Sequence, residues 1–286
     1  MANYTKQWSS DTPGYLIFLI DQSHSMSTIW VDNKSMAEFT AEVINKTINE
    51  LIATNAAGET VKDRVFISLI GYGGNPPVVA DISSDYLSKY ADNPLRVSKY
   101  AEKVKDGKGG TINVNVEMPI FLEAKADGWT PMGGAFDLAK RLIQGWIQKK
   151  ENHPVPVIIN VSDGYPEGPT SSSTEIEFQR TIMIANEIMK LQTADGNPLV
   201  FNVHITERGK EIQFPENEYE LEGNKMAELL FKISSKVPEA YKKAAKDQNL
   251  KRIGENSKGF ISNASPDTLI RFINFGSSGG TDRSST

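Results

Sequence analysis

Apolar residues occur along this chain in short runs that alternate with amphipathic segments. The runs are continuously apolar or β-favouring, which is typical of strands that are buried on both faces. The strands predicted in this way cover residues 15–20, 65–71, 155–161, 199–205 and 259–262. Between them, apolar positions recur at spacings of three and four, which indicates helices. The predicted helices cover residues 36–51, 135–146, 175–191, 226–245 with an interruption at Pro238, and 266–275.

The alternation of strands and helices predicts the fold class. Strands separated by helices form a mostly parallel sheet with right-handed crossovers and helices on both faces, so we expect a doubly wound, Rossmann-like α/β domain. We place this single domain at residues 15–275. It follows a lead-in at residues 1–14 and precedes a Gly- and Ser-rich flexible tail at residues 276–286.

The region from about residue 81 to residue 129 is the least regular part of the pattern. Pro76-Pro77 followed by an apolar triplet predicts a short edge strand at residues 78–80, and a short helix is expected near residues 85–90. A charged segment at residues 99–108 precedes alternating polar and apolar positions at residues 111–116, which favour a half-exposed strand or hairpin arm. We interpret the region as an insertion in the same domain.

Composition narrows the classes of function. The chain has 286 residues, 39% hydrophobic and 23% charged, with a net charge of −5 and no basic stripe, which argues against nucleic-acid binding. The absence of cysteine excludes disulfides, thiolate metal sites and cysteine nucleophiles. The first residues lack a secretory-signal pattern, and no apolar run approaches the ~18 residues of a membrane span. We therefore expect a cytoplasmic protein without a membrane partner.

Oxygen-bearing side chains follow the predicted strands. Asp21, Ser23 and Ser25 come directly after the first strand, Thr130 precedes a predicted helix, and Asp163 follows the strand at residues 155–161. In open α/β sheets ligands bind at the carboxyl ends of the strands, and hydroxyl and carboxylate oxygens are the ligands that magnesium prefers. Neither glycine-rich phosphate-binding signature occurs at a strand-to-helix junction, so the pattern predicts a divalent-cation site rather than a nucleotide site.

Each of these residues also has an ordinary structural explanation. Ser23 and Ser25 are suited to a polar turn, Thr130 before a proline is suited to a helix N-cap, and Asp163 before a glycine is a common turn pair. A shared position at one edge of the sheet favours the metal site over these separate explanations.

The histidines add little to this prediction. We expect His24, which alternates with the two serines, to point aside rather than to act in catalysis. His153 and His204 are too scattered along the sequence to form a ligand set.

The segments D-Q-S-H-S at residues 21–25, T-P-M-G-G at residues 130–134 and V-S-D-G at residues 161–164 carry a family resemblance. Together they resemble von Willebrand factor A (VWA) domains with a metal-ion-dependent adhesion site (MIDAS), with all five ligand positions present. The closing segment G-F-I-S-N-A-S-P-D-T-L-I-R-F-I and the extended T-P-M-G-G-A are most similar to the bacterial TerY-like branch, which is named for tellurite resistance. The resemblance spans roughly residues 15–275.

The resemblance implies a role for each residue. The Ser23, Ser25 and Thr130 hydroxyls would bind the metal directly or through water, and Asp21 and Asp163 would bind it directly or support the ligands. The metal would be Mg2+, with Mn2+ or Ca2+ as alternatives. An aspartate or glutamate of a protein partner would complete the coordination, which implies a non-enzymatic adaptor in a stress or signalling complex, beside a kinase or phosphatase.

Two other functions remain open at this stage. A metal-dependent hydrolase of the phosphoesterase type would use a metal-activated water, although the sequence places no clear general base or acid beside the site. A structural scaffold would leave the site empty. Cation binding separates the scaffold from the other two, and turnover of a phosphoester separates the hydrolase from the adaptor.

Overall fold

The computed structural model describes residues 4–105, 111–206, 209–250 and 253–278, and in these residues the largest sheet has seven strands. The strand order is β12-β13-β11-β10-β1-β6-β7. The strands are β1 (Gly14–Gln22), β6 (Val65–Gly73), β7 (Val78–Tyr86), β10 (Val157–Ser162), β11 (Leu199–His204), β12 (Ile212–Gln213) and β13 (Phe260–Ser262). The pairs among β6, β1, β10, β11 and β13 are parallel, and β7 and β12 are antiparallel at the two edges.

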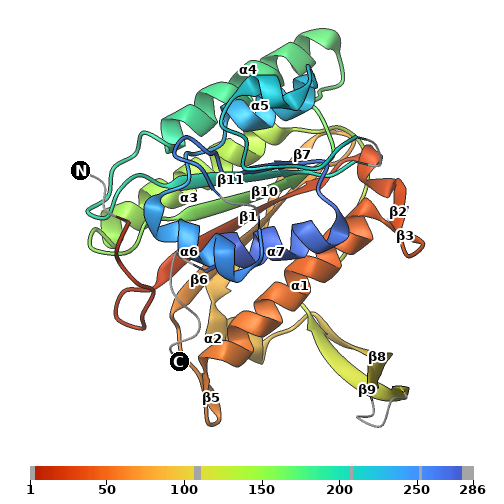
Figure 1. Ribbon diagram of the computed structural model, residues 1–286, viewed down its shortest axis with the longest axis vertical. Coiled ribbons are helices and arrows are strands. Elements are labelled where there is room, and N and C mark those ends of the chain that lie inside the picture. Colours follow the sequence, from red (N-terminus) through yellow and green to blue (C-terminus); the bar gives the residue numbers. More distant parts are fainter. Residues whose placement is uncertain (1–3, 106–110, 207–208, 251–252, 279–286) are drawn as a thin grey trace.

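Helices cover both faces of this sheet (Figure 1). On one face lie α1 (Met36–Asn55), α2 (Leu87–Asp92), α6 (Glu239–Asp247) and α7 (Pro266–Gly276). On the other lie α3 (Met132–Lys149), α4 (Ser171–Ile188) and α5 (Lys225–Lys232). The doubly wound, mostly parallel α/β fold class predicted from the sequence is therefore confirmed.

Strand β1 lies near the middle of the sheet and is buried along its whole length. Alternate side chains enter the two cores: Leu16 and Phe18 belong to the core on the side of α1, whereas Ile17 and Leu19 belong to the core on the side of α3. The continuous apolar run is thus explained by burial on both faces. Because β1 ends at Gln22, the polar residues that follow it emerge at the carboxyl edge of the sheet.

The irregular region contributes an edge strand and a separate ribbon. The predicted edge strand at residues 78–80 extends to Tyr86, because β7 pairs with β6 along almost its full length. After α2, strands β8 (Arg96–Lys105) and β9 (Thr111–Ile120) form an antiparallel hairpin that projects from the body (Figure 1). The alternating residues at 111–116 therefore belong to a hairpin arm, one of the two structures that the pattern favours.

Short elements complete the chain in the described residues. They are η1 (His24–Ser27), β2 (Ile29–Val31), β3 (Lys34–Ser35), β4 (Ala56–Ala57), β5 (Thr60–Val61) and η2 (Glu218–Leu221). Pro238, which interrupts the predicted helical segment, is the N-cap of α6 and separates it from α5. No helix in the described ranges combines the length and the apolar composition that crossing a membrane requires.

Both ends of the domain are attached to its body. Asp195 Oδ1 accepts hydrogen bonds from the backbone N–H groups of Thr5 and Lys6, at 2.8 and 3.1 Å, so the lead-in packs beside β11. Helix α7 ends at Gly276, and Ser277 and Ser278 are buried. Residues 279–286 of the predicted tail lie outside the described residues.

Candidate metal centre

Five parallel strands place a polar side chain at the same level of their carboxyl ends. Asp21 is in register with Tyr72, and Ser162 is in register with His204. The pairs Ile20–Val161 and Val203–Ile261 extend this register, so the row reads Tyr72, Asp21, Ser162, His204 and Ser262 across the sheet. All five residues are buried. We refer to these five residues as the polar row.

Asp21 lies between Tyr72 and Ser162 in the polar row, with only 1% of its surface exposed. Its Oδ1 accepts a hydrogen bond from the Ser23 N–H at 2.9 Å, and its Oδ2 accepts one from the Ser162 hydroxyl at 2.5 Å. Burial raises the pKa of Asp21, and the hydrogen bonds from Ser162 and Ser23 act in the opposite direction. No lysine or arginine among the described residues forms an ion pair with this carboxylate.

Ser23 and Ser25 continue the site from Asp21 towards solvent. After β1 the backbone enters the short helix η1, with Ser23 as its extended N-cap. The two hydroxyl oxygens are 3.1 Å apart, and the Ser25 hydroxyl donates to Asp163 Oδ1 at 2.8 Å. Because Ser23 is buried and Ser25 is exposed, the cluster opens to solvent on the Ser25 side.

Asp163 approaches the same hydroxyls from the end of β10. Burial, and next the charge of Asp21, raise the pKa of Asp163 to about 7. Gly164, the residue after Asp163, lies close to the cluster. A Cβ atom at this position would be 3.7 Å from Ser25 Oγ and 3.9 Å from Asp21 Oδ2. Two acidic side chains from neighbouring strands therefore meet at one pair of serine hydroxyls.

Thr130 is positioned by the backbone of its loop. The Gly128 carbonyl accepts a hydrogen bond from the His24 N–H at 3.0 Å, which ties this loop to η1. Thr130 itself forms two backbone hydrogen bonds with Glu167, at 3.1 and 3.0 Å, which tie it to the segment after Asp163. Thr130 is 4% exposed and lies between the two loops that carry the serines and Asp163. Hydrogen bonds thus join Asp21, Ser23, Ser25 and Asp163 into one cluster, whereas Thr130 is linked by its backbone to Glu167, and no hydrogen bond of the described residues joins it to the other four.

The oxygen donors of this cluster fit a hard divalent cation. Two carboxylates and three hydroxyls are available in the predicted set, and no lysine or arginine of the described residues forms an ion pair with Asp21 or Asp163. In the residues that the structure describes, no group of three or more His, Cys, Asp and Glu side chains could hold a metal, so a cation here would depend on the hydroxyls as well. Magnesium, manganese and calcium all accept such oxygen ligands.

Tyr72, Ser162, His204 and Ser262 belong to the polar row but were not predicted as parts of the site. Ser162 carried a signal in the sequence, because it is the last residue of a buried strand and directly precedes Asp163. Tyr72 and His204 carried none, since only the register of β6 and β11 against β1 and β10 brings them to this level. The predictions that His153 and His204 form no ligand set and that His24 has no catalytic role stay predictions.

His204 provides a test of the polar row through the pH dependence of stability. The side chain is 2% exposed, its Nδ1 is 3.3 Å from Ser262 Oγ, and burial lowers its pKa to about 4. The unfolded chain, with a pKa near ~6.5, therefore binds more protons between pH 4 and 6.5, so this residue contributes stability above pH 6.5 that is lost as the pH falls towards 4. The maximum loss is about 3 kcal/mol.

We expect this loss to appear as a difference between the wild type and His204→Gln. The comparison is needed because Asp163, with a raised pKa, gives the opposite slope over part of the same pH range. Urea unfolding between pH 4 and 8 should show the advantage of the wild type shrinking as the pH falls. A constant difference across the range would contradict the buried, neutral state of His204.

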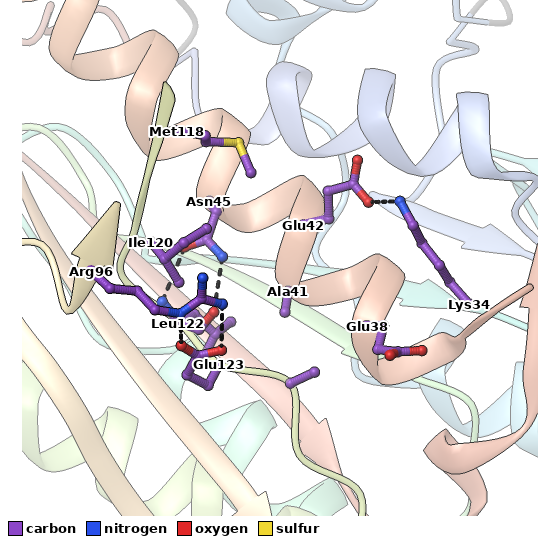
Figure 2. Close-up of a pocket in the computed structure, with 11 residues that line it drawn as sticks. Lys34, Glu38, Ala41, Glu42, Asn45, Arg96, Met118, Ile120, Leu122 and Glu123 are labelled. Carbon is purple, nitrogen blue, oxygen red and sulfur yellow. Dashed lines mark hydrogen bonds and ion pairs between the residues drawn. The ribbon is translucent and has the colours of Figure 1, made fainter. Parts of the chain in front are cut away.

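A pocket that is separate from the polar row lies between α1 and the base of the β8–β9 hairpin (Figure 2). Its volume is about 420 Å³, and Met118, Ile120 and Leu122 supply apolar lining. Asn45 on α1 fixes the hairpin base, because its Oδ1 accepts from the N–H groups of Phe121 and Leu122 at 2.8 and 3.0 Å. No residue of the predicted metal site lines this pocket.

No protein-family model matches the sequence, and no curated protein matches it. Solved structures that resemble the chain include the vWF domain of the type V pili tip protein Mfa5 from Porphyromonas gingivalis, at 16% identity and a TM-score of 0.31, over 56% of this chain and 43% of that chain. PilB minor pilin from Streptococcus sanguinis aligns at 9% identity and a TM-score of 0.46, over 94% of this chain and 61% of that chain.

Manganese-loaded TRAP protein from Plasmodium vivax aligns at 12% identity and a TM-score of 0.30, over 68% of this chain and 58% of that chain. The chain spans less than two thirds of the length of each of these three proteins. The fold class stated above rests on the strand order and pairing of this chain itself.

Proposed function

We propose that this protein is a binding module that holds a divalent cation, most suitably Mg2+, and uses it to grip an acidic side chain of a protein partner. Asp21, Ser23, Ser25, Thr130 and Asp163 would hold the cation. The observation that carries the proposal is that two largely buried carboxylates, which form no ion pair with a basic side chain of the described residues, meet at two serines of which Ser25 is exposed to solvent. Burying uncompensated charge is costly, and a bound cation removes that cost.

The charges of the site favour an acidic partner group. A bound cation supplies a Lewis-acidic position that attracts an oxygen ligand from outside the chain. Three of the five side chains are neutral hydroxyls, so the protein does not saturate the cation with negative charge. Ser25, at the solvent-exposed end of the cluster, marks the side from which a carboxylate would approach.

Binding accounts for this geometry better than catalysis does. His204, the histidine in the polar row, is only 2% exposed, so it is not available at the solvent-exposed side where a substrate would lie. The roles implied by the TerY-like resemblance, in a tellurite-resistance, stress or signalling complex beside a kinase or phosphatase, stay predictions. Mn2+ and Ca2+ stay alternatives to Mg2+.

The proposal is tested first with the cation alone. Metal-free protein should gain thermal stability when Mg2+, Mn2+ or Ca2+ is added, and a chelator should reverse the gain. A ligand at 100 times its dissociation constant stabilises the folded state by about 2.7 kcal/mol, which a thermal-shift assay resolves. Calorimetric titration should give one bound ion per chain. An unchanged unfolding temperature with all three cations would contradict the proposal.

The partner is tested next with a matched pair of proteins. Wild-type protein and Thr130→Ala, immobilised in Mg2+ or in chelator, should capture different sets of proteins from a lysate. A specific partner should be retained by the wild type in Mg2+ alone, and mutation of its acidic residues to amides should release it. Equal capture in chelator would mean that any partner binds elsewhere on the chain.

A further inference from the structure

The two oxygens of Asp21 are both engaged by the protein itself. Oδ1 accepts the Ser23 N–H and Oδ2 accepts the Ser162 hydroxyl, so the carboxylate is fixed from two sides before any ligand binds. The bond from Ser162 is the shorter of the two, at 2.5 Å against 2.9 Å. A hydroxyl that donates to a carboxylate forms a charge-assisted hydrogen bond, which is stronger than one between neutral groups. Ser162 is therefore a principal determinant of where Asp21 lies.

Ser162 also controls the loop that carries the second carboxylate. Its Oγ accepts a hydrogen bond from the Gly164 N–H at 3.0 Å, which leaves the hydroxyl hydrogen free to point at Asp21. Gly164 directly follows Asp163, so this one hydroxyl connects Asp21 on β1 with the turn that presents Asp163 after β10. The buried Ser162 hydroxyl thus links the two acidic residues by a second route, beside the one through Ser23 and Ser25.

A buried hydrogen-bond chain fixes the floor beneath this connection. The Tyr72 hydroxyl donates to Asn160 Oδ1, Asn160 Nδ2 donates to Asn202 Oδ1, and Asn202 Nδ2 donates to Ser234 Oγ, each at 2.9 Å. These side chains are fully or almost fully buried. Strands buried on both faces are ordinarily apolar, and each buried polar group costs free energy unless it is bonded. These hydrogen bonds tie β6, β10, β11 and the segment that follows α5 to one another beneath the site.

We propose that Ser162 is a positioning residue of the metal centre, which clamps Asp21 and the Asp163–Gly164 turn at the separation that a divalent cation requires. The inference rests on the proposed function for its purpose, although the clamp itself is a property of this chain. Ser162 would not touch the cation; it acts through Asp21 and through the backbone of Gly164. Supporting hydrogen bonds of this kind typically change metal affinity by about 10-fold to 100-fold when they are removed.

The polar row contains a matched control. Ser262 lies two strands from Ser162 in the same row, and the two serines are 1% and 0% exposed. The Ser262 hydroxyl is bonded to His204 instead of to Asp21. Ser262→Ala therefore removes the same atom from the same buried level, and any general effect of losing a buried hydroxyl should be similar in the two variants.

The experiment compares the wild type, Ser162→Ala and Ser262→Ala by calorimetric titration with Mn2+. We expect Ser162→Ala to bind Mn2+ about 10-fold to 100-fold more weakly and Ser262→Ala to stay close to the wild type. Equal affinities for all three proteins, or equal losses in both variants, would overturn the proposal. If Ser162→Ala does not fold, Ser162→Cys keeps nearly the same volume with a weaker donor, and its expected loss of affinity is in the same direction.

A second measurement does not depend on the cation. Amide hydrogen exchange of metal-free protein follows the Ser23 N–H, which is bonded to Asp21 Oδ1. Ser162→Ala should speed the exchange of this amide about tenfold by releasing Asp21, whereas Ser262→Ala should not. If the wild type binds no Mn2+, the proposed function fails, and the exchange rates still decide whether Ser162 positions Asp21. Unchanged exchange in Ser162→Ala would overturn the clamp.

Discussion

Replacing Asp21 by asparagine should abolish the response to divalent cations while making the metal-free protein more stable. The carboxylate is 1% exposed, and no basic side chain of the described residues pairs with it. Asparagine keeps an oxygen that can accept the Ser23 N–H but removes the buried charge. We expect at least a 100-fold loss of cation affinity, which corresponds to about 2.7 kcal/mol, together with a higher unfolding temperature in chelator.

The matched control for this variant is Asp195→Asn. Asp195 is also buried, at 3% exposure, but its carboxylate accepts hydrogen bonds from the backbone N–H groups of Thr5 and Lys6. It lies before the start of β11, whereas the polar row lies at the carboxyl ends of the strands. Its replacement should leave the cation-induced shift in unfolding temperature intact. Thermal unfolding of both variants, with and without Mg2+, checks the prediction. A full cation response in Asp21→Asn would remove Asp21 from the site.

Replacing Gly128 by alanine should damage both the fold and the site. Gly128 has φ of +63°, and a Cβ there would be 2.1 Å from the backbone carbon of Gly74 and 2.2 Å from its oxygen. The strand bridge between these two glycines, together with the bond from His24 to Gly128, sets the position of the loop that leads to Thr130. Because backbone cannot give way as a side chain can, the loop must move.

We expect Gly128→Ala to lose about 3 kcal/mol of stability, from the left-handed backbone and the clash together, and to bind cations at least about tenfold more weakly. Gly145 is the control, since a Cβ there would meet nothing within 4 Å and the residue lies inside α3. Gly145→Ala should raise stability by up to about 1 kcal/mol through better helix propensity. Urea unfolding and Mn2+ titration of both variants measure these effects, and a Gly128→Ala protein of wild-type stability would contradict the assigned loop geometry.

Local patterns in the sequence predicted the larger elements well, because periodicity reports burial directly. The apolar run at residues 15–20 is the centre of β1, and the helical spacing at residues 36–51 lies within α1. Where the pattern was weak, the prediction was incomplete. The edge strand predicted at residues 78–80 continues through polar residues to Tyr86. Backbone pairing with β6 stabilises these residues as a strand, although their sequence has no apolar pattern that would predict one.

The sequence by itself determined the α/β class and most of the segments that form the strands and helices, and it predicted a cation site from four oxygen-bearing residues that follow strands and from Thr130 before a helix. These properties depend on near neighbours along the chain, which a linear pattern records. Only the tertiary structure decided that Tyr72 and His204 join Asp21 in one row, that Ser162 connects the two acidic side chains, and that Gly128 meets Gly74. These relations arise from strand order and register between segments that lie far apart in the sequence, and no local pattern encodes which strands become neighbours.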